Sequence, residues 1–127
     1  MIKFTSLSPN IFVKDMDKAL DFYQKLGFDI QMSVPETKPF HWSMISNGEL
    51  TLMLQAWESL GDQLPEVQVN EKHSLLFYIQ VQGLMELFDQ FKDSVFLLKG
   101  LEKTFYGATE FSLMDPDGYI LTFAEDL

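Results

Sequence analysis

Few side chains in this sequence are suited to catalysis or metal binding. The chain contains two histidines, His41 and His73, and no cysteine. Without cysteine there are no disulfides, zinc–thiolate sites or cysteine nucleophile. Asp15, Asp17 and Asp21 lie at the start of a predicted helix, where the helix dipole accounts for acidic residues. The predicted strands assemble no Ser–His–Asp triad, and the isolated glycines form no phosphate-binding loop.

Glu110 is the acidic residue that most needs an explanation, because it lies within a strand predicted over 104–114. If its side chain faces an apolar cavity, it must hold a proton, pair with a lysine or meet a cationic ligand. The alternative is that Glu110 faces solvent at a bulge after Gly107. Phe105 and Tyr106 come shortly before it and are candidates to stack on a planar ring.

The charge balance limits the classes of partner. The chain has 19 acidic residues against 9 basic ones, a formal net charge of −10, and every basic residue is a lysine. The electrostatic field of this negative charge repels the phosphates of nucleic acids, and the lack of arginine disfavours bidentate binding of anions. We therefore expect no nucleic-acid partner and a neutral or cationic ligand. The alternative is that the acidic surface serves solubility alone.

The length and hydrophobicity of the chain predict its domain size and its location in the cell. At 127 residues and 46% hydrophobic residues, the chain has the size and composition of one globular domain. No apolar run approaches the roughly 18 residues that a membrane helix needs, and residues 1–8 lack the apolar centre of a signal peptide. We therefore expect a cytoplasmic protein with no membrane partner.

The first half of the sequence predicts the element order β-α-β-β-β. Residues 10–14 form a short apolar run typical of a strand, and apolar residues then recur at helical spacing over 16–26. Strands are predicted over 28–34, 40–45 and 50–55, and Asn47-Gly48 is a strong hairpin signal between the last two.

The second half predicts the same order. It has a strand over 73–81, a helix over 84–91, and strands over 95–98, 104–114 and 119–125. The strand over 104–114 has an interruption near Gly107 as an alternative. An offset of 68 aligns Val13 with Val81, and an offset of 70 aligns Gly48 with Gly118. The sequence therefore predicts an internal repeat.

Three local patterns resemble the glyoxalase/bleomycin-resistance/extradiol-dioxygenase superfamily, also called vicinal oxygen chelate proteins. They are Val13–Tyr23 with Leu26-Gly27-Phe28, Tyr106–Phe111, and Asp115–Tyr119. The resemblance implies an α+β fold of two tandem βαβββ units, with a curved mixed sheet around a cavity and helices on the convex side. It also implies a homodimer. We expect a single domain over 1–127, with units at about 8–56 and 73–125 and a connector over 57–72.

The resemblance also indicates where a metal would be held. Enzymes of this superfamily use His, Glu or Gln side chains from the first and last strand of each unit. The matching positions here are Ser8, Leu52 (or Met53 if the hairpin slips by one residue), Leu76 and Thr122. None of these side chains is a good metal ligand, so we expect no metal and no cofactor.

Strand alternation assigns residues to the faces of the predicted strands. If the ligand positions point into the cavity, an apolar and aromatic set with a few polar groups joins them. The candidate ligand-binding residues are Asn10, Phe12, Trp42, Met44, Leu52, Leu54, Tyr78, Tyr106, Glu110, Ser112 and Thr122. Phe12 and Leu52 are alternatively plain core residues, and methionines are often gap-fillers.

The leading hypothesis is a metal-free binding protein of the bleomycin-resistance type that sequesters an aromatic or cationic compound. One alternative is a metal-dependent lyase or dioxygenase of the same superfamily, in which Gln55, His73 or Glu125 binds the metal after a shift of register. Another is a domain that acts through its dimer surface without a small molecule. The identity of the ligand, the presence of a reaction and the dimer geometry do not follow from the sequence.

Overall fold

The computed structural model describes residues 1–60, 65, 67 and 72–127. The chain divides into two compact units, Met1–Val69 (unit 1) and Asn70–Leu127 (unit 2), and each is described by itself. The larger part of the predicted connector lies outside the described residues.

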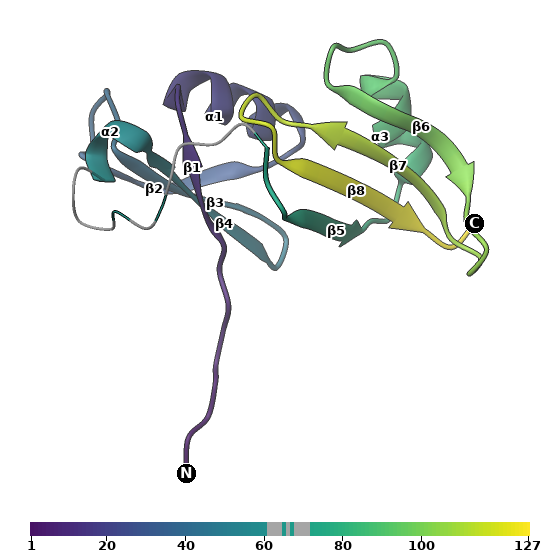
Figure 1. Ribbon diagram of the computed structural model, residues 1–127, viewed down its shortest axis with the longest axis horizontal. Coiled ribbons are helices and arrows are strands. Elements are labelled where there is room, and N and C mark those ends of the chain that lie inside the picture. Colours follow the sequence, from purple (N-terminus) through teal and green to yellow (C-terminus); the bar gives the residue numbers. More distant parts are fainter. Residues whose placement is uncertain (61–64, 66, 68–71) are drawn as a thin grey trace. The chain divides into compact units, whose positions relative to one another are not determined.

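Unit 1 contains a four-stranded mixed sheet with the order β1-β4-β3-β2 (Figure 1). β1 and β4 are parallel, and the other neighbouring strands are antiparallel. Its elements are β1 (Asn10–Val13), α1 (Met16–Lys25), β2 (Asp29–Val34), β3 (Trp42–Asn47), β4 (Leu50–Ala56) and the short helix α2 (Trp57–Leu60).

Helix α1 begins and ends where the sequence predicts. Asp15 is the N-cap, and its carboxylate accepts a hydrogen bond from the backbone N–H of Lys18 at 3.1 Å. Gly27 follows the helix with a φ of 99°, a conformation that favours glycine. The buried side chains of the helix repeat at helical spacing and pack toward β4: Met16, Ala19, Leu20, Phe22 and Tyr23.

Unit 2 repeats this architecture with the order β5-β8-β7-β6. β5 and β8 are parallel, and β8, β7 and β6 are antiparallel neighbours. Its elements are β5 (Leu76–Gln80), α3 (Leu84–Phe91), β6 (Leu97–Lys103), β7 (Thr109–Met114) and β8 (Ile120–Glu125). The two tandem βαβββ units predicted from the sequence are thus confirmed.

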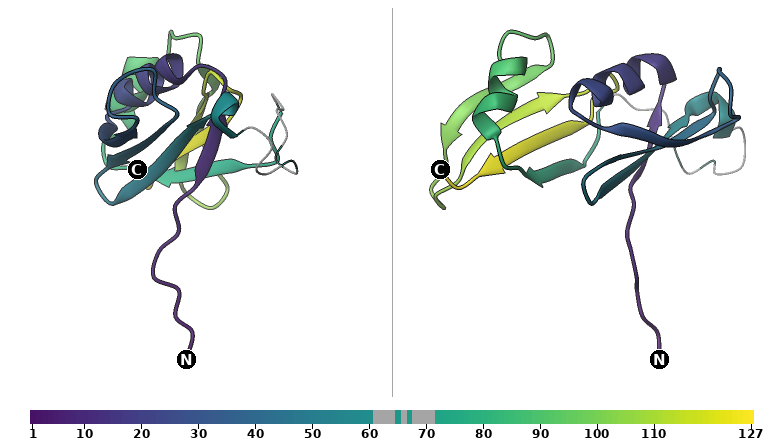
Figure 2. Two further views of the ribbon diagram at one scale, coloured as in Figure 1. Left: turned by 90° about the vertical axis from the view of Figure 1, so that its left-hand side faces the viewer. Right: turned by 180° about the vertical axis from the view of Figure 1, so that it is seen from behind.

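Each sheet has one face that packs against the long helix of its own unit. In unit 1 this face carries Ile11, Val13, Ile45, Leu52 and Leu54, all buried. We call the other face, opposite α1 in unit 1 and opposite α3 in unit 2, the open face of that unit. Figure 2 shows each helix lying over one face of its own sheet.

Three predicted elements differ from the structure. β6 runs over 97–103 and is longer than the strand predicted over 95–98. The strand predicted over 104–114 begins only at Thr109, because Gly107, with a φ of 93°, lies in the turn between β6 and β7. Helix α2 lies at the start of the stretch predicted to be a connector.

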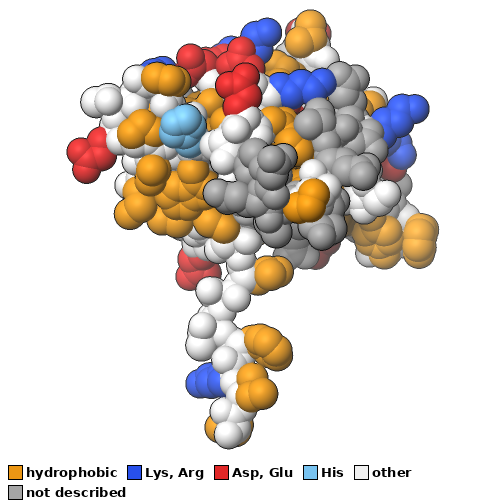
Figure 3. Space-filling model, turned by 60° about the vertical axis from the view of Figure 1, so that its left-hand side comes forward, with side chains coloured by type: hydrophobic (Ala, Val, Ile, Leu, Met, Phe, Trp, Pro, Cys, Tyr) orange, Lys and Arg blue, Asp and Glu red, His pale blue; other side chains and the backbone are white. Residues whose placement is uncertain are grey.

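Residues 1–9 form an extended arm that precedes β1 and leaves the sheet of unit 1 (Figure 1). Apolar side chains follow one another along it, among them the exposed Ile2, Phe4 and Leu7 (Figure 3). Within the described residues, no helix has the length and hydrophobicity needed to cross a membrane.

Candidate functional site

The open face of unit 2 carries a row of polar residues that crosses three strands. Tyr78 on β5 lies opposite Thr122 on β8, which lies opposite Ser112 on β7. In the next row, Ala124 on β8 lies opposite Glu110 on β7. Directly opposed residues of neighbouring strands point to the same face, so these side chains share one surface.

Two tyrosine hydroxyls meet the Glu110 carboxylate on this face. Tyr78 donates a hydrogen bond to Glu110 Oε2 at 2.6 Å, and Tyr106, from the turn between β6 and β7, donates to the same oxygen. Glu110 is 9% exposed, whereas Tyr78 and Tyr106 are 48% and 56% exposed. The tyrosines therefore cover the carboxylate and keep one side of their rings in solvent.

The carboxylate holds both hydroxyls in the protonated form. The hydrogen bond to Glu110 raises the pKa of Tyr78 well above its ordinary value of 10.0. The same kind of hydrogen bond raises the pKa of Tyr106. Ionising either phenol would place a second negative charge beside the carboxylate. Both tyrosines are thus hydrogen-bond donors at neutral pH.

Other polar side chains on this face also have hydrogen-bond or ion-pair partners. The hydroxyls of Ser112 and Thr122 are 2.8 Å apart, and both side chains are buried. Lys99 on β6, opposite Ser112, forms an exposed ion pair with Glu102 at 2.8 Å. The structure therefore brings together five of the predicted site residues: Tyr78, Tyr106, Glu110, Ser112 and Thr122.

The open face of unit 1 is apolar and aromatic. Met44 on β3 lies opposite Met53 on β4, and Trp42 lies opposite Gln55. Phe12 on β1 also lies opposite Gln55. All of these side chains are partly exposed, which is typical of a surface that is neither core nor fully solvated.

Two contacts extend this face beyond the residues expected from the sequence. The ring of Phe12 lies against that of Trp57, the first residue of α2, with a centroid separation of 5.2 Å. The side chain of Asn10 donates a hydrogen bond to Gln55 at 2.9 Å. The predicted residues Asn10, Phe12, Trp42 and Met44 thus share one face, and Met53, Gln55 and Trp57 join them.

The prediction that Leu52 and Leu54 line the same surface is wrong. They are 7% and 0% exposed and belong to the face covered by α1, because they alternate with Met53 along β4. The residue of unit 1 that corresponds to Thr122 is Met53 and not Leu52. Met53 is the alternative expected if the hairpin slips by one residue.

The slip has its origin in the two hairpin turns. In unit 1, Asn47 pairs with Leu50 around a turn of two residues, Gly48 and Glu49. In unit 2, the backbone of Asp115 bonds to that of Tyr119 around three residues, 116–118. Aligning the two glycines therefore displaces β4 by one residue, and a displacement of one residue exchanges the faces of a strand.

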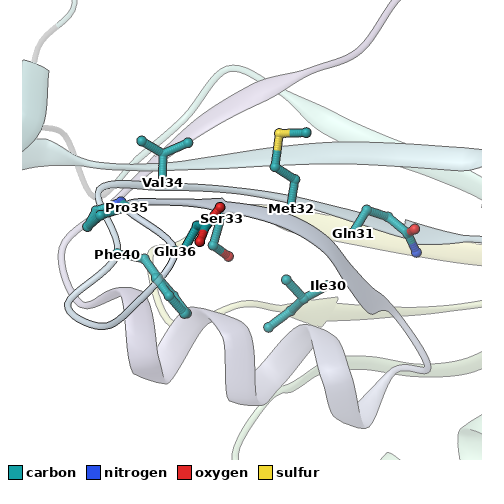
Figure 4. Close-up of a pocket in the computed structure, with 8 residues that line it drawn as sticks. All are labelled: Ile30, Gln31, Met32, Ser33, Val34, Pro35, Glu36 and Phe40. Carbon is teal, nitrogen blue, oxygen red and sulfur yellow. The ribbon is translucent and has the colours of Figure 1, made fainter.

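A groove of about 580 Å³ runs along β2, one of the two edge strands of the unit 1 sheet, and the loop that follows it. Figure 4 shows Met32 and Val34 pointing to one side of the strand, and Ile30 and Phe40 pointing to the other, toward α1. The groove thus wraps around the strand edge. Sequence reasoning did not assign these residues to a site, because alternation alone does not show which strand lies at an edge.

The residues proposed as metal ligands after a register shift have structural partners instead. Gln55 bonds to Asn10, as described above. His73 Nε2 lies 3.0 Å from the carbonyl oxygen of Asp117, and its ring stacks on Tyr119 at a centroid separation of 3.8 Å. Glu125 accepts hydrogen bonds from the backbone N–H groups at the start of α3.

Comparison with known proteins identifies the family. The model of the Glyoxalase/Bleomycin resistance protein/Dioxygenase superfamily matches residues 5–123. The chain belongs to this superfamily. No curated protein matches the chain significantly.

Solved structures agree on the superfamily fold. A protein of unknown function from Agrobacterium tumefaciens is 21% identical, with a TM-score of 0.80 and coverage of 100% of this chain and 98% of that chain. A bleomycin-binding protein complexed with bleomycin is 22% identical, with a TM-score of 0.66 and coverage of 98% and 100%. A bleomycin resistance determinant encoded on the transposon Tn5 is also 22% identical, with a TM-score of 0.69 and coverage of 97% and 98%.

The residues of this chain do not fit the metal that enzymes of the superfamily bind. The four matching positions hold Ser8, Met53, Leu76 and Thr122, and these supply two hydroxyls, a thioether and a hydrocarbon. Hard or borderline divalent metals require imidazole, carboxylate or carbonyl donors. Thr122 is in addition hydrogen-bonded to Ser112. Among the described residues, no group of three or more His, Cys, Asp or Glu side chains is placed to hold a metal.

Proposed function

We propose that this superfamily member is a metal-free small-molecule binding protein that sequesters an aromatic or cationic compound without turning it over. The observation that carries the proposal is the open face of unit 1. Phe12, Trp42 and Trp57 present partly exposed rings there, beside Met44 and Met53. Flat apolar rings bind to such surfaces by stacking and by removal of apolar area from water.

The two neighbours named for bleomycin support the proposal by analogy, because one of them binds this small molecule on the same fold. The formal net charge of −10 adds that a neutral or cationic ligand is favoured over an anion. The metal positions support binding without metal-assisted chemistry, since their side chains are poor donors.

Tryptophan fluorescence gives a direct test, because both tryptophans of the sequence, Trp42 and Trp57, lie on this side of unit 1. Titrating the full chain with bleomycin and with a panel of neutral and cationic aromatic compounds should quench the emission. Isothermal calorimetry should give a stoichiometry of one or less per chain. No binding by any compound of the panel would contradict the proposal.

A matched pair of variants locates the site. Trp42→Leu removes a ring from the open face, and we expect it to weaken binding by about tenfold or more, as the loss of a buried aromatic anchor does. Met85→Leu changes an exposed apolar residue of α3 in unit 2 and should leave the affinity unchanged. Equal affinities of the two variants would mean that the ligand does not bind at the open face of unit 1.

Metal analysis separates this function from the lyase or dioxygenase alternative. Purified protein should contain no stoichiometric divalent metal after expression in metal-supplemented medium. One equivalent of bound metal that survives dialysis would overturn the proposal, because the proposed protein binds its ligand without a metal. The metal would then be held by residues other than the four matching positions.

The homodimer, the single domain and the cytoplasmic location stay predictions. Exposed apolar side chains along residues 1–9 support an association between chains. Sedimentation velocity of the full chain should show twice the mass of one chain, and removal of residues 1–8 should shift the equilibrium toward one chain.

A further inference from the structure

Among the described residues, hydrogen bonds reach only one of the two carboxylate oxygens of Glu110. Both tyrosine hydroxyls donate to Oε2, and Oε1 receives no hydrogen bond from any residue that the structure describes. No fully buried side-chain oxygen or nitrogen in this described part of the chain lacks a partner, so Oε1 must reach the surface. It therefore reaches the surface on the open face of unit 2, near the two tyrosine hydroxyls that bond to Oε2.

Among the described residues, no lysine of unit 2 forms an ion pair with Glu110, although the charge of Glu110 contributes to the raised pKa of Lys99. Lys99, the lysine of the neighbouring strand, forms its ion pair with Glu102, which lies opposite Glu110 across the β6–β7 ladder. Glu110 itself has no ion pair within 4.0 Å among the described residues. Glu110 is 9% exposed, and its two hydrogen-bond donors are neutral hydroxyls, so a cationic donor would add a charge-assisted hydrogen bond.

We infer that Glu110, on the open face of unit 2, anchors a positively charged nitrogen group of a small-molecule ligand, a protonated amine, amidine or guanidine. Its N–H donors would bind Oε1, while Tyr78 and Tyr106 fix the carboxylate through Oε2 and present their ring faces to the cation. This inference rests on the proposed function and specifies the charge of the ligand, which that proposal leaves open.

The chemistry favours a cation over a neutral donor for two reasons. A charge-assisted hydrogen bond to a carboxylate is roughly twice as strong as a neutral one, and it supplies the missing counter-charge. The overall field of a chain with a net charge of −10 also attracts cations. A metal ion is disfavoured, because one carboxylate with a single free oxygen offers too few ligands.

A pair of probes that differ only in charge tests this. Naphthalene-2-carboxamidine is a cation at pH 7, and naphthalene-2-carboxamide is a neutral molecule of nearly the same shape. Calorimetric titration of the full chain should show a preference of about tenfold or more for the amidine. In Glu110→Gln the affinity for the amidine should fall by about that factor, and the affinity for the amide should change by less than about twofold.

Glu86→Gln is the matched control, because it removes the same charge from an exposed residue in the first turn of α3, on the opposite side of the sheet of unit 2. It should retain the preference for the amidine. Thermal unfolding of each variant shows that it is folded. An amidine that binds wild type and Glu110→Gln equally, or that fails to bind wild type at millimolar concentration, overturns the inference.

The same titrations separate the two proposals. If aromatic compounds bind with an affinity that depends on Trp42 but not on charge or Glu110, the inference fails and the proposed function stands. If the amidine binds through Glu110 and Trp42→Leu changes nothing, the inference stands and the aromatic site of unit 1 is contradicted.

Discussion

The open faces of the two units have the same arrangement of strands but carry side chains of different chemistry. The row Asn10, Met53, Met44 and Met32 in unit 1 has the register of the row Tyr78, Thr122, Ser112 and Lys99 in unit 2. In the next row, Trp42 of unit 1 occupies the place of Glu110. An apolar surface in one unit thus corresponds to a hydrogen-bonded, charged surface in the other.

The difference shows which positions the fold itself constrains. On the helix-covered faces the two units carry the same kind of residue, since Leu52 and Leu54 correspond to Leu121 and Phe123, and all four are buried. Ser43, which is buried and hydrogen-bonded to Ser33, is an exception at the place of Phe111. The open faces differ at every position compared above. A core must be apolar to stabilise either unit, whereas an open face is free to specialise for a ligand.

The largest expected effect tests the assignment of faces in β4. Leu54→Ala should lower the free energy of unfolding by about 3 kcal/mol, because it empties space in a fully buried core. Met53→Ala, one residue earlier on the open face, should cost less than about 1 kcal/mol. Urea denaturation of both variants measures the difference. Similar losses would mean that the faces of β4 are assigned incorrectly.

This pair of residues also marks the limit of what the sequence predicts. Helical spacing, Asp15 as N-cap and the hairpin at Asn47-Gly48 are local signals, and the structure confirms the elements they predict. The face of β4 depends on turn length. Gly48 is the first of two turn residues and Gly118 the last of three, so an alignment of glycines misplaces Leu52 and Leu54.

The next effect concerns the acidic half of the comparison. Glu110→Ala removes the acceptor of two hydrogen bonds, and we expect a loss of about 2 kcal/mol in the free energy of unfolding at pH 7. It should also lower the pKa of Tyr78 and of Tyr106 toward the ordinary value, because the carboxylate is the main cause of both increases. The 13Cζ resonances of labelled tyrosine report each pKa separately, and Tyr23 and Tyr119 serve as internal controls.

The sign of the pH dependence follows from linkage. The pKa values of these two tyrosines are higher in the folded chain than the unfolded value near 10.0. Above that pH the folded state binds more protons than the unfolded state, so stability decreases as pH rises. The stabilisation is complete below about pH 10. The free-energy difference between wild type and Glu110→Ala should therefore be constant from about pH 7 to about pH 10 and should narrow above that range. A difference that widens in alkali would contradict the cluster.

The contacts of Glu110 were only partly predictable. Strand alternation places it on one face with Ser112, and the structure agrees. Its burial, however, depends on Tyr106, which comes from the turn after β6, and on Tyr78, which is 32 residues away in the sequence. Side-chain positions in a turn, and contacts between distant strands, do not follow from a local pattern.

The helix caps extend the comparison with a smaller effect. Helix α1 is capped locally by Asp15, whereas α3 has no side-chain cap of its own, and Glu125 of β8 accepts from the N–H groups of Gly83 and Leu84 at 3.2 and 3.0 Å. Either Asp15→Ala or Glu125→Ala should cost about 1 kcal/mol. Hydrogen exchange should increase in α1 for the first variant and in α3 for the second. Unchanged protection of α3 in Glu125→Ala would show that the remote cap is not needed.

A further effect of about the same size concerns the row in which Ser112 and Thr122 of unit 2 correspond to Met44 and Met53 of unit 1. Ser112→Ala leaves the Thr122 hydroxyl without its partner on a buried part of the face, and should cost about 1 kcal/mol. The double variant Ser112→Ala with Thr122→Val removes both hydroxyls, and should be no less stable than the single one. A thermodynamic cycle on the four proteins gives the coupling between the two side chains. Additive losses would mean that the two hydroxyls act independently. The hydrogen bond between Ser112 and Thr122 would then not stabilise the polar row of unit 2, and each hydroxyl would be hydrogen-bonded to water instead.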